Sequence, residues 1–215
     1  MRRGSHTTTT TLDAAIVVVI CFGVSIVLSI RAVLAGFPDS PFTDAGMIGL
    51  VVTEIVLAAT ALLFLHARGF DIASLLPQPT LRGTLLGVGL FFVAWVIGIL
   101  VTAPFAHAQP EQPIQRMMAD ARVTSSVIVV LGMVNGAFEE VFLLGVLVRG
   151  LRAFGLSIAI GIPLLVRVLY HLYQGPLGAL WILSFGLVFS LFYVRSPTLW
   201  PPVFAHVLWD IVPFA

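Results

Sequence analysis

Long apolar runs dominate this chain and limit what it can fold into. Seven of them follow one another, at residues 12–35, 44–66, 80–105, 123–148, 156–173, 177–194 and 198–215. About 17 to 25 apolar residues suffice for a helix that crosses a bilayer. Because lipid offers exposed backbone groups no partner, such segments become helices or closed barrels. The pattern predicts an all-α, multi-pass transmembrane bundle of about seven helices, one domain over residues 12–215 that follows a disordered tail at residues 1–11.

The composition supports a membrane protein independently of the runs. Hydrophobic residues make up 59% of the chain and charged residues only 10%, against roughly 25% charged residues in an average soluble domain. The formal net charge is +1, and there is no basic patch of the kind that binds nucleic acid. Cys21 is the only cysteine, so no disulfide can form within the chain. We therefore expect the lipid bilayer, and no nucleic acid, as a partner.

The basic residues indicate an orientation. All 11 are arginine, which hints at a GC-rich genome, and we expect a bacterial cytoplasmic membrane. With the N-terminus in the cytoplasm, one side of the bundle collects Arg2, Arg3, Arg68, Arg82, Arg149, Arg152 and Arg195. Cytoplasmic loops carry an excess of Lys and Arg, so the sequence predicts a cytoplasmic N-terminus.

Two adjacent acidic residues, Glu139 and Glu140, lie inside the fourth apolar run. Ionisable residues within a membrane usually face the bundle interior and mark function. His171 lies near the end of the fifth run, and the seventh contains His206 and Asp210, one helical turn apart. Taken singly, each residue has a structural explanation, such as an ion pair or a hydrogen bond. Their joint occurrence favours proton transfer or metal-assisted hydrolysis.

Other features of the runs bear on packing. Glu54 stands alone in the second run. We interpret it as a residue that makes a structural hydrogen bond, or as a sign that the boundary of this run is misplaced. Pairs of glycine four residues apart let helices approach closely in a membrane, and the chain has two such pairs, Gly83 with Gly87 and Gly132 with Gly136. Glu140 shares the helical face of the second pair. The glutamates should therefore lie beside a tight helix contact.

The order of these residues resembles a known family. Glu139-Glu140, then His171 in the run 167–175 (RVLYHLYQG), then the run 205–210 (AHVLWD), is similar to the patterns EExxxR, FxxxH and HxxxN/D on successive helices. These patterns characterise the CPBP family of intramembrane proteases, also called CAAX protease or Abi proteins. The resemblance covers residues 135–215. It implies a membrane-embedded hydrolase that acts on a peptide or protein substrate in or at the membrane.

The resemblance also implies roles. Glu139 is similar to the general base that activates a water, with His171 as its partner. His206 and Asp210 match the pattern assigned to stabilising the oxyanion. An ionised Asp cannot donate a hydrogen bond to an oxyanion, so we expect Asp210 to orient His206. Two His and several carboxylates could bind a divalent metal such as zinc, with Glu139, His171 and His206 as candidate ligands. A glutamate-activated water needs no metal, and the sequence leaves this open.

Two positions depart from the family patterns. Leu144 stands where an Arg is expected, and Arg167 stands where a Phe is expected. One cation is thus lost from the first motif helix and another is gained on the second. Arg167 lies one turn before His171 and so shares its face. We expect a structural ion pair between Arg167 and Glu140, with catalytic candidates Glu139, Glu140, His171, His206 and Asp210.

These interpretations lead to an intramembrane endopeptidase of the CPBP type. Two alternatives stay open: a non-catalytic relative that binds a membrane partner in the same cavity, and a proton- or ion-coupled transporter, since Glu, His and Asp that line a bundle also describe that class. For a hydrolase, Glu139, His171, His206 and Asp210 should meet in one cavity that opens to the cytoplasmic side.

Overall fold

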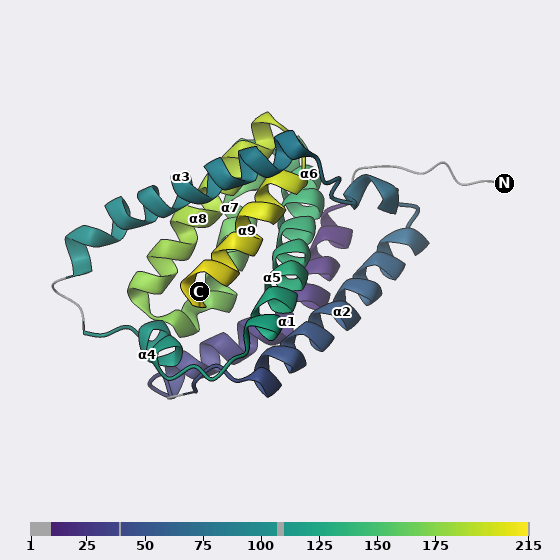
Figure 1. The fold of residues 1–215 in the computed structure, drawn as a ribbon. Coiled ribbons are helices and arrows are strands. Elements are labelled where there is room, and N and C mark those ends of the chain that lie inside the picture. The colour runs from purple at the N-terminus through teal and green to yellow at the C-terminus, as the bar shows by residue number, and fades with distance from the viewer. Residues whose placement is uncertain (1–9, 39, 107–109, 215) are drawn as a thin grey trace.

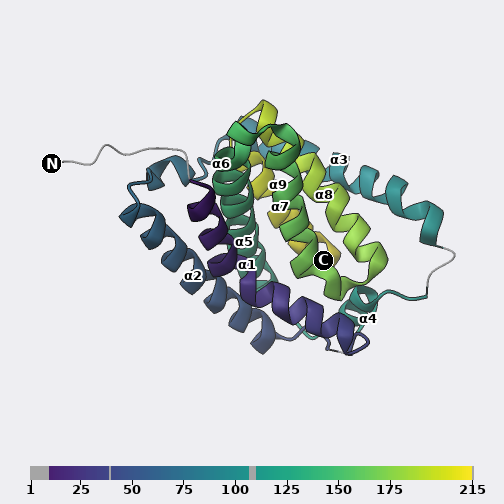
Figure 2. The same cartoon turned by 180° about the vertical axis from the view of Figure 1, so that it is seen from behind.

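The computed structural model describes residues 10–38, 40–106 and 110–214. These residues form an all-α bundle (Figures 1 and 2). Its α-helices are α1 (Thr11–Leu34), α2 (Asp44–Ala67), α3 (Leu81–Ala106), α4 (Pro113–Ala119), α5 (Ser125–Glu140), α6 (Arg149–Leu151), α7 (Leu156–His171), α8 (Pro176–Arg195) and α9 (Trp200–Ile211). The shorter helices are η1 (Ile72–Leu75), η2 (Val141–Val148), η3 (Arg152–Phe154), η4 (Leu172–Gln174) and η5 (Val212–Phe214), of which η2 is a π-helix.

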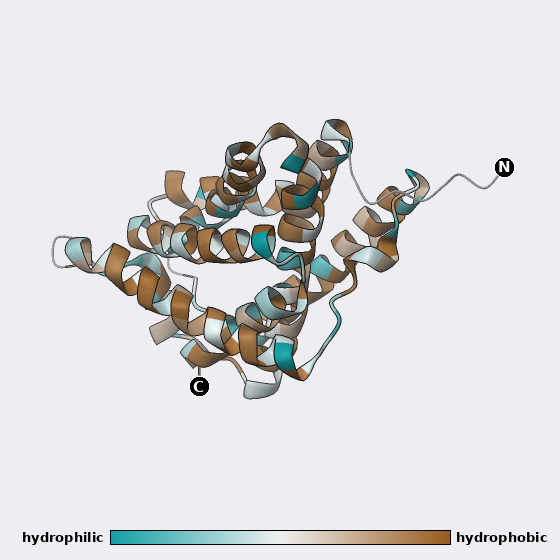
Figure 3. Cartoon of the chain, turned by 90° about the horizontal axis from the view of Figure 1, so that it is seen from above, coloured by the Kyte–Doolittle hydropathy of each residue, from teal (hydrophilic) through white to brown (hydrophobic). Residues whose placement is uncertain are grey.

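Six of the predicted spans are confirmed as helices long and apolar enough to cross a membrane. Brown, hydrophobic residues predominate along them in Figure 3. The seventh, α9, has only 12 residues, about 18 Å at 1.5 Å per residue, so it is too short to cross a bilayer alone. The expected tail at residues 1–11 lies mostly outside the described residues. Of its last two residues, Thr10 caps α1 in a capping box with Asp13, and Thr11 is the first residue of that helix.

The fourth span is longer than the sequence suggested. The apolar run ends near Val148, but the helical rod of α5, η2, α6 and η3 continues to Phe154, giving a span of 30 residues. Gly155, with φ of +96°, then makes the turn into α7, a conformation that glycine adopts most readily. Gly155 stands midway in sequence between Glu139 and His171. Both side chains therefore lie at similar depths on the two arms of one helical hairpin.

Both glycine pairs pack against α9. A Cβ added at Gly87 would lie 2.8 Å from the carbonyl oxygen of Pro201, and one added at Gly136 would lie 3.1 Å from the backbone nitrogen of Val207. Only glycine permits such backbone approach. The short helix α9 is thus held between α3 and α5 inside the bundle, as the yellow helix in Figure 1 shows.

The two ends of the bundle differ. The C-terminal end of α2, the helix α6 and the C-terminal end of α8 lie at the end where α1 begins (Figures 1 and 2). These segments carry arginines that the sequence assigned to the cytoplasm, and Arg68 pairs there with Asp13 at 2.9 Å. The helix α4, the connection between α1 and α2, and η5 lie at the opposite end. The cytoplasmic assignment itself remains a prediction.

Candidate active site

Glu139 and Glu140 end α5, at the point where the helix widens into the π-helix η2. Glu140 is fully buried, and the side chain of Arg167, also buried, reaches both carboxylates from α7. Its Nη2 donates to Oε1 of Glu140 at 2.7 Å, and its Nη1 donates to Oε2 of Glu139 at 3.2 Å. The expected pair of Arg167 with Glu140 is therefore present. The sequence did not anticipate that the same guanidinium also holds Glu139.

Leu144 does not leave a gap where the family pattern has Arg. Its side chain is buried in an apolar cluster that includes Phe185 and Phe189. Arg167 lies over the ring of the same Phe185, with its Cζ 5.0 Å from the ring centroid, an arrangement that attracts a cation. The cation at Arg167 thus contacts a ring of the same cluster that buries Leu144.

Tyr170 is a site residue that the sequence analysis missed. Its buried hydroxyl donates to Oε2 of Glu139 at 2.5 Å, the oxygen that also accepts from Arg167. One oxygen of Glu139 is thereby fixed by two donors. The only signal in the sequence was a tyrosine directly before His171, which is indistinguishable from a tyrosine at a membrane interface.

His171 ends α7 and faces the other oxygen of Glu139. Its Nδ1 lies 2.9 Å from the carbonyl oxygen of Arg167. A carbonyl only accepts, so Nδ1 carries the proton and Nε2 of the neutral ring is left with a lone pair. Nε2 lies 4.0 Å from Oε1 of Glu139. This separation is too long for a hydrogen bond and suits two acceptors that share a water between them.

His206 approaches the glutamates from α9. Its Nδ1 donates to Oε1 of Glu140 at 2.7 Å. Its Nε2 lies 3.9 Å from Oε2 of Glu139 and 3.7 Å from Oδ1 of Asp210, both beyond hydrogen-bond range. Glu140 thus makes the hydrogen bond to His206, and Asp210 contacts the ring only as an ion pair. The expected role of Asp210 in orienting His206 stays a prediction. Asp210 accepts from Asn135 of α5 at 2.9 Å.

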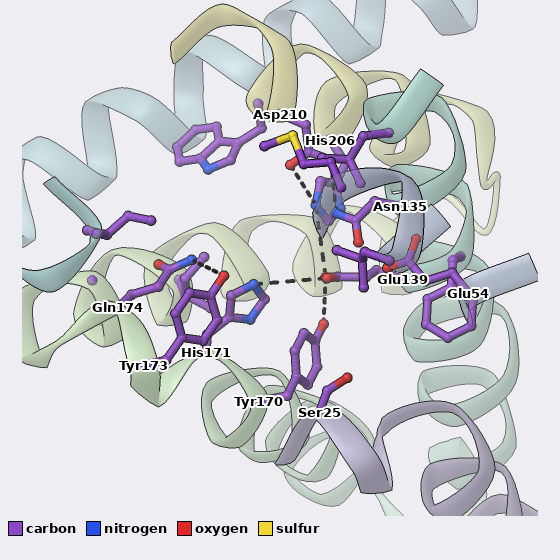
Figure 4. Close-up of a pocket in the computed structure, with 18 of the residues that line it drawn as sticks. Ser25, Glu54, Asn135, Glu139, Tyr170, His171, Tyr173, Gln174, His206 and Asp210 are labelled. Carbon is purple, nitrogen blue, oxygen red and sulfur yellow. Dashed lines mark hydrogen bonds and ion pairs between the residues drawn. The ribbon is translucent and has the colours of Figure 1, made fainter. Parts of the chain in front are cut away.

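Glu139, His171, His206 and Asp210 all line one cavity, of about 320 Å³ (Figure 4). Most of its remaining wall is apolar or aromatic, and Glu54, Asn135, Tyr170, Tyr173 and Gln174 also contribute. Convergence of the four residues agrees with the expectation for a hydrolase. Figure 4 shows Glu139 among Tyr170, His171 and His206, with dashed contacts to all three.

The cavity extends toward the end of the bundle that is opposite the start of α1. At that end it is lined by residues of the α1–α2 connection, α4 and η5, which are Phe42, Ile114, Met118, Pro213 and Phe214. Its lining includes no residue of α6, η3 or the connection between α8 and α9. A cytoplasmic N-terminus and a cavity that opens to the cytoplasm therefore exclude each other, and the two expectations cannot both be right.

The donor set does not fit a metal ion. Among the described residues, one group of three has ligand atoms that all lie within 4.8 Å of one another, and it consists of Glu139, Glu140 and His206. Oε1 of Glu140 already accepts from Arg167 and from Nδ1 of His206, and Oε2 of Glu139 accepts from Tyr170 and Arg167. The guanidinium thus takes the place beside both carboxylates where a cation would sit.

Residues 122–212 match the family model of the type II CAAX prenyl endopeptidase Rce1-like proteins. No curated protein and no solved structure matched the chain. The matched segment begins just before α5 and ends just after α9, so it contains Glu139, Arg167, His171 and His206. This segment of the membrane protein is therefore similar to the Rce1-like type II CAAX prenyl endopeptidase family, which is consistent with the CPBP resemblance of its motifs.

Proposed function

We propose that this protein is an intramembrane endopeptidase in which Glu139 and His171 activate a water. The observation that carries the proposal is the 4.0 Å gap between Oε1 of Glu139 and Nε2 of His171, on the wall of a cavity inside a membrane bundle. Both atoms accept hydrogen bonds. A water between them donates one proton to each and turns a lone pair toward a substrate carbonyl.

The remaining contacts give each residue a role. The water attacks the carbonyl carbon of the scissile peptide bond, and its proton passes to Oε1 of Glu139. His206, held by Glu140 at Nδ1, donates from Nε2 of its imidazolium to the oxyanion. The carbon–nitrogen bond then breaks, and the leaving amine takes the proton back from Glu139. Tyr170 and Arg167 keep Oε2 of Glu139 in place throughout, so the reacting oxygen is Oε1.

Replacement of Glu139 tests the proposal. The protein is co-expressed with a panel of single-span membrane proteins, and new termini in the panel are identified by mass spectrometry. Glu139→Gln keeps the shape of the side chain but removes the base, so cleavage should fall at least about 100-fold. The control is Glu111→Gln, an exposed glutamate outside the cavity, which should cleave as the parent does.

Equal cleavage by Glu139→Gln and by the parent would refute the assigned base. If the parent cuts no member of the panel while it folds normally, the alternative of a non-catalytic binding protein is favoured. Helix content and the thermal midpoint in detergent show whether each variant is folded.

A further inference from the structure

Glu54 is a buried carboxylate that the mechanism does not use. It lies in the middle of α2, only 5% exposed, and lines the cavity beside the catalytic candidates (Figure 4). Its Oε2 has no hydrogen-bond partner among the described residues. Among the described residues, the one other buried side-chain atom without a hydrogen-bond partner is Oε2 of Glu140, and Glu140 does not line the cavity. The structural hydrogen bond expected for Glu54 at Oε2 is therefore not found, and an uncompensated carboxylate there would be costly.

The surroundings of Glu54 are mostly acidic. Glu54 interacts electrostatically with Glu139, Asp210 and His206, two of which are themselves acidic. The guanidinium nitrogens of Arg167 are already bonded to the two adjacent glutamates. This side of the cavity therefore brings together the carboxyl groups of Glu54, Glu139 and Asp210.

The rest of the cavity wall suits a long side chain with a charged end. It is lined by large apolar and aromatic groups, among them Phe22, Leu57, Trp181, Trp209 and Phe214. The methylene stem of a lysine or an arginine packs well against such a surface while its head reaches a polar partner. A carboxylate or phosphate on the substrate would instead be repelled by Glu54 and Asp210.

We propose that Glu54 binds the basic side chain of a peptide substrate, a lysine or an arginine close to the bond that is cut. The proposal rests on the proposed function for the identity of the ligand as a peptide. Two structural observations support it: an oxygen of Glu54 has no hydrogen-bond partner among the described residues, and the cavity wall is apolar apart from a few polar groups that include Glu54 and Asp210. Glu54 thus determines specificity, and Glu139 performs the chemistry.

Binding measured without cleavage tests the proposal. The probes are pairs of apolar membrane-spanning peptides that are identical except for one lysine or its neutral counterpart norleucine, placed at successive positions. Affinity is measured by tryptophan fluorescence in lipid nanodiscs, since Trp181 and Trp209 line the cavity. A Glu139→Gln background keeps the peptides intact, so loss of cleavage bears only on the proposed function.

At one or two positions, the lysine peptide should bind about tenfold or more tightly than its norleucine partner, as expected for a charge-assisted hydrogen bond. Glu54→Gln should abolish this preference and leave norleucine binding unchanged, while Glu54→Asp should keep part of it. Thr53→Val is the control at the preceding position of α2, which also lines the cavity, and it should keep the full preference. A preference that survives in Glu54→Gln, or no preference before that change, would overturn the proposal. A purely structural role for Glu54 predicts instead a lower thermal midpoint in Glu54→Gln and equal losses for both peptides.

Discussion

Arg167→Leu tests the electrostatic core of the site. The guanidinium is only 2% exposed and makes charge-assisted hydrogen bonds to Glu139 and Glu140 at 3.2 and 2.7 Å. Leucine preserves apolar packing against Phe185 but leaves both carboxylates without their cation. Removal of one partner from a buried ion pair costs roughly 3 to 5 kcal/mol, whereas an exposed pair contributes about 0 to 1 kcal/mol. We therefore expect the free energy of unfolding to fall by roughly 3 to 5 kcal/mol.

Leu144→Arg makes the test specific to charge. An Arg at this position lies one turn from Glu140 on the same helical rod and packs in the cluster that contains Phe185. Alone, it places a second cation beside Arg167 and should destabilise the protein. Combined with Arg167→Leu, it should restore about 1 to 3 kcal/mol relative to the sum of the single effects.

The assay is reversible unfolding in mixed micelles, followed by circular dichroism, for both single variants and the double variant. Arg195→Leu is the control, because Arg195 is exposed and its loss should change stability by no more than about 0.5 kcal/mol. Two outcomes would refute the reasoning: strictly additive effects in the double variant, or a loss in Arg167→Leu no larger than that in the control.

Three further predictions concern activity. Tyr170→Phe removes one of the two donors to Oε2 of Glu139 and should lower kcat about 10-fold with KM unchanged; an equal rise in KM would indicate a role in substrate binding instead. Phenanthroline or EDTA should leave the cleavage rate within about twofold, since Arg167 occupies the cationic position, and a loss that zinc restores would contradict this. Gly136→Val should lower activity more than Gly49→Val, which has open space around it, because a Cβ at Gly136 would lie 3.3 Å from Cβ of His206; equal effects of the two changes would argue against this packing role.

Much of the fold could be predicted because backbone groups in lipid find no hydrogen-bond partners outside the chain, so apolar runs of sufficient length form helices. Run length alone identified six helices long enough to span, and the glycine spacing identified two close helix contacts. The boundary at Val148 was wrong because the segment from Arg149 to Phe154 contains two arginines and resembles a loop, although the helical rod continues through it. The arginines could not show whether this segment is a loop or the end of a helix, because arginine is also favourable in the last turn of a helix.

Only the ion pair of the site could be predicted in detail from the sequence. A glutamate pair buried in lipid needs a cation, and Arg167 was the one within the motif runs, so their contact followed from charge balance. Hydrogen bonds across helices carry no such signal. That Tyr170 binds Glu139 and that Glu140, rather than Asp210, binds His206 depends on the rotation of each helix. That Oε2 of Glu54 has no partner among the described residues is likewise a property of the assembled cavity.

The hairpin turn at Gly155 has a consequence for how the chain enters the bilayer during synthesis. On insertion scales, each charged residue at the centre of a lone span costs roughly 2.5 to 3.5 kcal/mol, and this chain has two in one arm and one in the other. Since Arg167 already pairs with both glutamates between these consecutive arms, the two spans can leave the translocation machinery together with two of their three charges balanced. Only one negative charge then waits for His206 of α9 to be made.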